Sequence, residues 1–291
     1  MSKEERRSIV ATVIVILIAA GLAFAGSQGG HQVAGIPVYA LGVALAFLIQ
    51  WLAFIPAWVN RTEKFYDLTG SITYLTVTVT ALLLSPGADA RAWLLGGLVT
   101  VWAVRLGSFL FLRIRAAGED RRFREIKQSF GRFLLTWTLQ GLWVAFSLAA
   151  ALAAITSTLR RDLDLFAVMG TVIWLTGFLI EVIADRQKSA FNAMPGNKGK
   201  FIQSGLWSWS RHPNYFGEIV LWIGVTVIAL PILQGWQWVT LISPVFIVIL
   251  LTRISGVPLL ESRADQKWGG EAEYESYKAR TSILVPLPPK K

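Results

Sequence analysis

The sequence contains no cysteine and only two histidines, His31 and His212. Without cysteine there can be no disulfide, no thiolate metal site and no cysteine nucleophile. Two histidines are also too few for a histidine-rich zinc or di-iron site, so no metal is expected. Charged residues make up 16% of the chain, against about 25% in an average soluble domain. These shortages exclude several kinds of catalytic centre and argue against a soluble protein.

Apolar residues take the place of the missing charges, at 54% of the 291 residues, and there are 13 tryptophans. Tryptophan is enriched where membrane helices meet the lipid headgroups. Several apolar runs approach the roughly 20 residues that cross a bilayer as a helix. The sequence therefore predicts an all-α, polytopic membrane bundle of about seven or eight helices. The expected spans are Ile9–Ala25, Val38–Trp58, Thr69–Ser85, Trp93–Arg113, Phe133–Ile155, Leu165–Ala184, Phe216–Leu233 and Trp238–Thr252.

Two of these spans have alternative interpretations. Ile9–Ala25 follows a short basic leader and could be a signal peptide, but the later apolar runs favour a first membrane helix. The last two runs are close together and could form a re-entrant hairpin.

The basic residues predict the orientation. Eight crossings place both termini on one side, and the connections on that side hold most of the 28 lysines and arginines. The opposite side holds Arg91, Arg160 and Arg161. This asymmetry predicts cytoplasmic termini, and Arg121, Arg122 and Arg124 are interpreted as ordinary cytoplasmic charge. The net charge of +10 is attributed to these loops and to anionic membrane lipid, so neither nucleic acid nor an obligate protein partner is expected.

The stretch from Ser210 to Glu218 concentrates polar chemistry at the start of an apolar run. It contains Arg211, His212, Asn214, Tyr215 and Glu218. An interfacial turn facing lipid headgroups would explain the cation and the phenol, but Glu218 falls inside the apolar helix, where a carboxylate is costly. We therefore expect this stretch to bind an anionic, hydrogen-bonding ligand at the membrane surface.

Other polar residues lie inside or next to the expected spans, where ionisable groups are candidates for function. Glu181 and Asp185 are four residues apart and share one helix face. Structural pairing, such as Arg105 with Glu181, is the alternative to a hydrated pocket. A loop after Asp185 and an amphipathic tail supply further candidates for ligand contact. The remaining candidates are Gln50, Asp67, Lys188, Asn192, Lys200, Arg253, Glu261, Tyr274 and Tyr277.

Three segments together resemble the bacterial branch of the steroid 5-alpha-reductase family. They are Asp67-Leu-Thr-Gly-Ser71, Arg211-His-Pro-Asn-Tyr-Phe-Gly-Glu218, and the tail from Glu261 to Tyr277. The resemblance implies an integral protein of the bacterial inner membrane, with NADPH bound among the C-terminal helices. It also implies that the enone of a 3-oxo-delta-4 steroid, or of another lipophilic substrate, enters from the bilayer. One membrane domain is expected, with an extra N-terminal helix over 1–35, substrate-side helices over 36–155 and cofactor-binding elements over 156–291.

The resemblance also implies residue roles. Asn214, Glu218, Arg253 and Asp185 match cofactor-contacting positions of the family. Asp67 stands where the animal enzymes have a glutamate that polarises the substrate, and Trp102 falls near their substrate-side tyrosine. With Trp102, we place Arg105 and Gln50 on the substrate side.

The expected reaction transfers hydride from NADPH to the beta carbon of the enone. A donor aimed at the carbonyl oxygen stabilises the charge that develops there. We assign this role to a protonated Asp67, with Tyr66 or Tyr74 as the second donor.

Rival classes remain open. A similar motif occurs in isoprenylcysteine and phospholipid methyltransferases, which bind S-adenosylmethionine, and in delta-14 and delta-7 sterol reductases. A lipid-binding or transport protein ranks last, because no internal repeat is visible.

Overall fold

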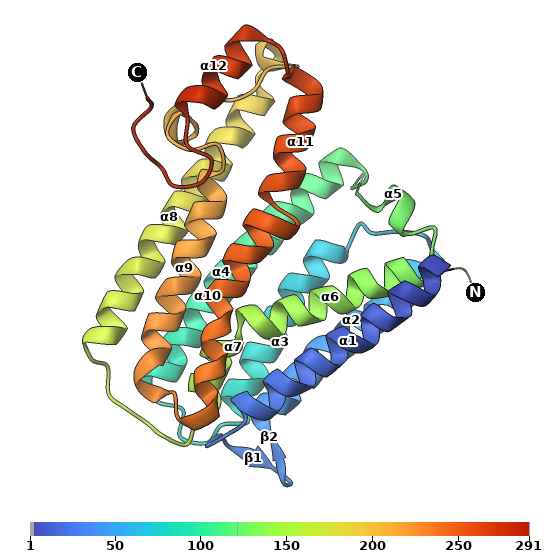
Figure 1. Ribbon diagram of the computed structural model, residues 1–291. Helices are drawn as coiled ribbons and strands as arrows, with labels where there is room; N and C mark the ends of the chain where they lie inside the picture. Colours follow the sequence, from blue (N-terminus) through green and yellow to red (C-terminus); the bar gives the residue numbers. More distant parts are fainter. Residues whose placement is uncertain (1–2, 121, 291) are drawn as a thin grey trace. The chain divides into compact units, whose positions relative to one another are not determined.

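The computed structural model describes residues 3–120 and 122–290 and is almost entirely helical (Figure 1). Arg121, one of the arginines assigned to cytoplasmic charge, lies outside the described residues. The α-helices are α1 Lys3–Gly26, α2 Val38–Val59, α3 Tyr66–Leu83, α4 Ala90–Ala117, α5 Phe123–Ile126, α6 Phe130–Ser147, α7 Ala149–Thr156, α8 Leu165–Ala193, α9 Pro213–Ala229, α10 Ile242–Ile249, α11 Val257–Trp268 and α12 Ala272–Arg280.

Short elements connect these helices. A two-residue hairpin pairs β1 (Gln32–Val33) with β2 (Ile36–Pro37) in antiparallel register. Its turn residues Ala34 and Gly35 both have positive φ, of 50° and 79°, as a type I′ turn requires. The remaining turns are 3-10 segments at Pro195–Asn197, Gly205–Ser208, Leu230–Ile232 and Gly235–Leu241, and a π-helical segment at Leu250–Ile254.

The fold class is confirmed: the protein is a polytopic helical membrane protein. Within the described residues, six helical stretches are long and apolar enough to cross a bilayer, and α6 with α7 forms a seventh if the pair is one span. The third expected span, now α3, is not among these candidates. Threonines dilute its apolar character, and three of them, Thr69, Thr73 and Thr76, bond back to the carbonyl four residues earlier. Such bonds satisfy a hydroxyl within its own helix.

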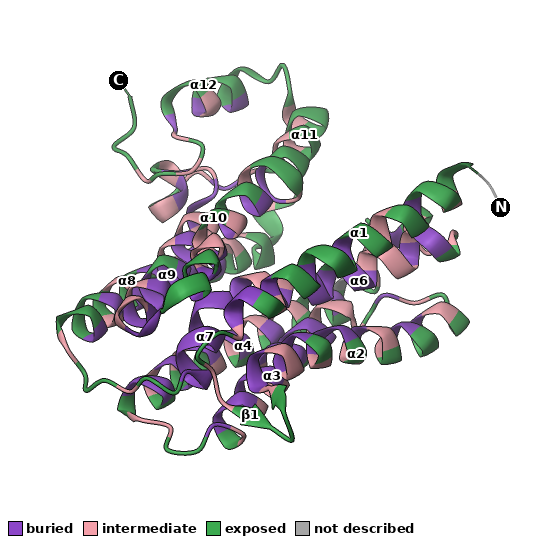
Figure 2. Ribbon diagram, turned by 60° about the horizontal axis from the view of Figure 1, so that its bottom comes forward, coloured by how far each residue is buried: buried purple, intermediate pink, exposed green. Residues whose placement is uncertain are grey.

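The expected single helix Phe133–Ile155 is wrong, because the chain bends by 57° between α6 and α7. The bend frees the carbonyl of Ser147, which accepts a hydrogen bond of 2.6 Å from the Ser243 hydroxyl. A bend in a helix needs such a substitute partner for its backbone. All eight residues of α7 are buried, as the colouring in Figure 2 shows.

The chain forms two compact units. Unit 1 comprises Met1–Ala167 and Ile228–Ser243, and unit 2 comprises Val168–Val227 and Pro244–Lys291. The expected division at residues 35 and 155 stays a prediction. In unit 1, Phe54, Phe133 and Trp137 form an aromatic core. The exposed face of α1 carries Leu17 and Phe24, which suits contact with lipid chains rather than with water.

In unit 2, one helix differs from expectation. Helix α8 does not end near Ala184 but continues to Ala193, because the residues after Asp185 include good helix formers and the first breaker is Pro195. The amphipathic tail, for which no helix bounds were expected, forms the two helices α11 and α12. They are separated at Gly269 and Gly270, and Gly270 has a φ of +86°.

Candidate functional site

The candidate site begins with the close packing of α8 against α9, which run side by side in Figure 1. A Cβ added at Gly217 would lie 2.6 Å from the carbonyl oxygen of Gly177, and one at Gly177 would lie 2.5 Å from that of Gly217. Gly224 makes the same approach to Gly170, seven residues earlier on α8. Small residues let membrane helices approach backbone to backbone. This contact holds α8 and α9 closely together in unit 2.

Near the start of α9, polar side chains of the two helices meet. The Asn214 amide nitrogen donates to the Asp185 carboxylate at 3.2 Å. Asn214 and Glu218 lie four residues apart on α9, as Glu181 and Asp185 do on α8, so each helix presents two polar groups on one face. Glu181, Asp185 and Glu218 are all buried.

Glu261 on α11 brings Arg211 and His212 into the same region. Its carboxylate receives the Arg211 guanidinium at 2.8 Å and His212 Nε2 at 2.8 Å. The Arg211 side chain is 9% exposed and that of Glu261 is 21% exposed. The His212 ring stacks on Tyr215, with ring centroids 5.7 Å apart. We call Asp185, Arg211, His212, Asn214 and Glu261 the polar cluster.

Burial sets the charge of His212, and the pairing with Glu261 sets which ring nitrogen carries the proton. Burial lowers the pKa of His212 below its usual range, and the charges of Lys188 and Arg211 act in the same direction, although the bond to Glu261 opposes them. The ring is therefore neutral near pH 7. A carboxylate paired with arginine only accepts, so the proton of His212 lies on Nε2 and its Nδ1 is an acceptor.

Some atoms of the polar cluster lack partners. Within the described residues, Nε of Arg211, Nδ1 of His212 and Oδ1 of Asn214 are buried and make no hydrogen bond. Buried polar groups are nearly always hydrogen-bonded, and an exception needs an explanation. One donor and two acceptors therefore suit a ligand that carries both kinds of group.

The C-terminal tail covers the start of this motif. The Arg211 N–H donates to the Ser282 carbonyl at 2.8 Å, and the Ser210 hydroxyl donates to the Leu284 carbonyl at 2.8 Å. Tyr274 and Tyr277, expected to close over a pocket, are both buried. Their hydroxyls donate to Asp265 at 2.9 Å and to the Trp207 carbonyl at 2.7 Å. In this structure the two phenols therefore fasten the tail.

The remaining cofactor candidates are spread over unit 2. Lys188 and Asn192 lie on α8 and not in the expected loop. The Lys188 ammonium lies 4.4 Å from the centre of the Trp207 ring, while Asn192 is exposed. Arg253 is exposed in the π-helical segment.

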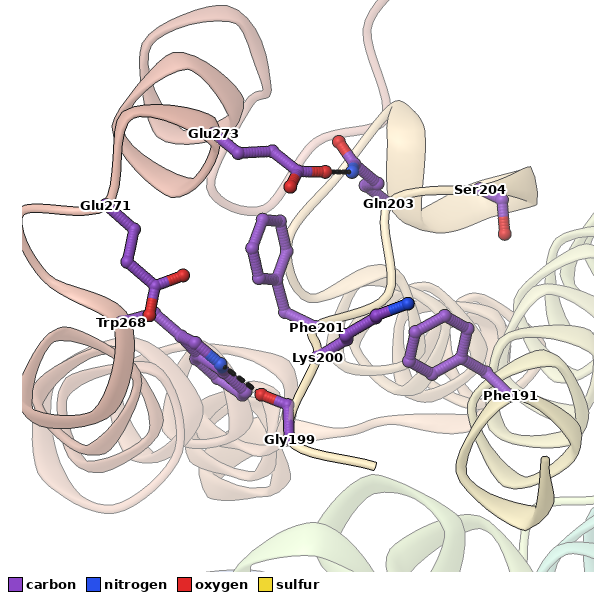
Figure 3. A pocket seen from close by; sticks show the side chains of 9 residues that line it. All are labelled: Phe191, Gly199, Lys200, Phe201, Gln203, Ser204, Trp268, Glu271 and Glu273. Atoms are coloured by element: carbon purple, nitrogen blue, oxygen red, sulfur yellow. Dashed lines mark hydrogen bonds between the residues drawn. The ribbon is translucent and has the colours of Figure 1, made fainter. Parts of the chain in front are cut away.

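Lys200 lines a pocket of about 250 Å³ in unit 2 (Figure 3). The other expected cofactor residues are not among the residues that line it. Phe191, Phe201 and Trp268 form its aromatic walls, and Glu271 and Glu273 lie at its rim.

The substrate-side candidates lie in unit 1. The Gln50 amide donates to the Thr73 hydroxyl at 2.8 Å, and Tyr66 donates to the Thr136 carbonyl at 3.0 Å. Tyr74 is buried with its ring against Trp102, at 5.0 Å between centroids.

Charged groups complete that set. Asp67 lies 4.0 Å from Arg113. Burial raises the pKa of the Asp67 carboxyl, although the positive charges of Arg122 and Arg113 act against this rise. Arg105 lies over Phe109 at 5.3 Å.

Comparison with known proteins places the chain in a family. Residues 53–281 match the model of a family described as Protein of unknown function (DUF1295). The chain belongs to the DUF1295 family. Over 119 residues it is 30% identical to the Bos taurus protein 3-oxo-5-alpha-steroid 4-dehydrogenase 1, and this stretch covers 40% of each chain. The resemblance to the steroid 5-alpha-reductase family is thereby confirmed as a distant homology over part of the length. No solved structure was found to match.

Several residues of this family member went unnoticed in the sequence. The spacing of seven between Gly170 and Gly177, repeated in Gly217 and Gly224, could have indicated the close helix contact. The aromatic residues Phe201 and Trp268 carry no local signal, because they come together only through the fold of unit 2.

Proposed function

We propose that the protein is an NADPH-dependent reductase that reduces the C=C bond of a lipophilic enone, with a 3-oxo-delta-4 steroid as the first candidate. The observation that carries the proposal is the polar cluster, with its buried atoms that lack partners. The distant relationship to a bovine protein named as a steroid 4-dehydrogenase supports it. A chain of this family would then be an integral membrane enzyme.

The residues of unit 2 fit such a cofactor. His212 Nδ1 and Asn214 Oδ1 would accept hydrogen bonds from amide or hydroxyl groups of the cofactor, and the Arg211 Nε–H would donate to it. Arg211, Lys188 and Lys200 supply the cations that suit phosphate oxygens. When bound, NADPH would supply the hydride.

The residues of unit 1 would act on the substrate. The reaction adds hydride to the beta carbon and a proton to the alpha carbon of the enone, and negative charge builds on the carbonyl oxygen in the transition state. A phenol or carboxylic acid placed at that oxygen would stabilise this charge. Asp67 and Tyr74 remain candidates for this role. Tyr66 is a weaker candidate, because its hydroxyl already donates a hydrogen bond to the Thr136 carbonyl.

We further propose that the substrate enters from the bilayer, and that both termini face the cytoplasm of a bacterial inner membrane. The exposed apolar side chains of the helices support the first proposal. The uneven distribution of the basic residues between the two sides of the membrane supports the second. We propose membrane lipid as a partner of the protein, besides the substrate and the cofactor.

The decisive experiment mixes the detergent-purified protein with NADPH, and separately with S-adenosylmethionine, and measures thermal stability. A ligand that binds only the folded state at a hundredfold excess over Kd adds about 2.7 kcal/mol to the free energy of unfolding. Stabilisation by NADPH, together with progesterone-dependent loss of reduced nicotinamide absorbance, would support the reductase. Stabilisation by S-adenosylmethionine alone would refute it in favour of a methyltransferase.

A variant tests the substrate role separately. Asp67→Asn should lower kcat at least tenfold, because the general acid contributes about 10²-fold or more to such steps, and should leave the Kd for NADPH unchanged. If the affinity for NADPH fell as much as kcat, Asp67 would not be a residue that acts on the substrate.

A further inference from the structure

The pocket of unit 2 has rigid aromatic walls. The Trp268 indole N–H donates to the Gly199 carbonyl at 2.6 Å, which fixes the ring plane. The Phe201 ring lies 5.6 Å from that of Trp268 and 5.3 Å from that of Tyr274. Phe191, from α8, points toward the pocket from the opposite side (Figure 3). A flat ring would therefore find aromatic surfaces already held in place.

The rim of the pocket offers hydrogen-bond acceptors. Glu271 and Glu273 both line it, and the Gln203 amide donates to Glu273. Of the described residues that line the pocket, Lys200 is the one with a positive charge. A ligand with an exocyclic amine suits this rim, because carboxylates accept from an amine and repel a carbonyl oxygen.

The pocket and the polar cluster both include a residue of α11. Trp268 lies seven residues after Glu261 on α11, which places it on the same face and about 10 Å further along the axis. Asp265 lies between them and is bonded to Tyr274 and Lys278, at 2.9 Å and 2.7 Å. A ligand held at the polar cluster could thus extend along α11 to the pocket.

We propose that this pocket binds the adenine ring of the nucleotide cofactor. Its volume of about 250 Å³ is smaller than the roughly 300–1,000 Å³ of sites that enclose a drug-sized ligand, so it suits one ring system and not a whole dinucleotide. Adenine is planar, stacks on aromatic side chains and presents its amine to Glu271. The inference rests on the proposed function only for the identity of the cofactor, because S-adenosylmethionine carries the same ring.

The test measures dissociation constants for the full-length protein in detergent. The probes are AMP, IMP, NADPH, S-adenosylmethionine and reduced nicotinamide mononucleotide, which lacks adenine. Phe201→Leu and Phe191→Leu remove stacking surface but keep apolar volume. Trp209→Leu is the control, because Trp209 is exposed and does not line the pocket.

Both phenylalanine variants should weaken AMP and NADPH by about 10-fold to 100-fold, with reduced nicotinamide mononucleotide unaffected. Glu271→Gln should narrow the preference for AMP over IMP, which a purely structural residue would not do. Phe201→Leu and Phe191→Leu are independent tests, so one of them still tests the pocket if the other fails to fold.

Three outcomes separate this inference from the proposed function. Wild-type affinity for NADPH in both phenylalanine variants overturns the pocket and leaves the reductase standing. Binding of S-adenosylmethionine instead of NADPH, weakened by Phe201→Leu, supports the pocket and refutes the reductase. A wild-type protein that binds none of the adenine-containing probes overturns the inference.

Discussion

Replacing Glu261 by glutamine tests whether the polar cluster is held together by charge. The substitution keeps the shape of the side chain and an oxygen that can accept from His212. It removes the negative charge that faces Arg211 at 2.8 Å. The remaining contact of that guanidinium with a backbone carbonyl, at Lys278, is long, at 3.5 Å.

The expected loss follows from burial. Removing one partner of a buried ion pair costs about 3–5 kcal/mol, because the other charge stays buried and uncompensated. Glu261 is 21% exposed and Arg211 is 9% exposed, so solvent recovers part of this and we expect about 2–3 kcal/mol. At about 2–4 °C per kcal/mol for a chain approaching this size, the unfolding temperature should fall by about 5–10 °C.

The assay is thermal unfolding of the detergent-purified protein at pH 7.5, followed by tryptophan fluorescence. Glu125→Gln is the matched control, because Glu125 is an exposed carboxylate on α5 and its charge should be worth little. The reasoning fails if Glu261→Gln unfolds within one degree of this control.

Three further predictions concern unit 2. Burial lowers the pKa of His212, so on acidification the unfolded chain binds a proton at this residue before the folded chain does. The free energy of unfolding should therefore be highest above about pH 6.5 and fall as the pH drops below it. His212→Gln should make the unfolding temperature less dependent on pH between pH 7.5 and 5.5, and an unchanged pH dependence would contradict this. Gly217→Ala should cost about 1–3 kcal/mol of unfolding free energy, since the new Cβ would meet α8 backbone at 2.6 Å, while Gly196→Ala, in open space, should cost almost nothing; equal losses would refute the close packing. Lys200→Ala should weaken NADPH binding about tenfold and leave NADH binding unchanged, because its ammonium would bind the 2′-phosphate that NADH lacks. Calorimetric titration with both cofactors would contradict this if the two affinities fell equally.

The apolar pattern predicted the membrane helices well where a helix is uninterrupted. Expected span Val38–Trp58 differs from α2 by one residue at its end. Hydropathy could not predict the bend between α6 and α7, because it is stabilised by Ser243, far along the chain from Ser147. Hydropathy also predicted an end of α8 that is too early. The sequence stops being apolar at Asp185, but the residues that follow still favour a helix.

The candidate site was predictable in composition but not in connectivity. The spacing of Glu181 and Asp185 placed them on one face, and the position of Asn214 after a proline placed it at a helix start. The pairing of Arg211 and His212 with Glu261 spans about fifty positions and leaves no local pattern. That unit 1 supplies the hydrogen-bond donor to the substrate carbonyl stays a prediction, because the roles of Asp67 and Tyr74 depend on a substrate.

The hydrogen bonds between the motif and the tail have a consequence for biosynthesis. The acceptor of the Ser210 hydroxyl lies 74 residues further along the chain. During translation, Arg211 and its neighbours therefore leave the ribosome well before the backbone that will satisfy them. A nascent chain that stops short of Ser282 would hold every residue of the polar cluster yet leave the Arg211 N–H and the Ser210 hydroxyl without their acceptors in the tail, which would mark the unfinished chain for chaperones and proteases.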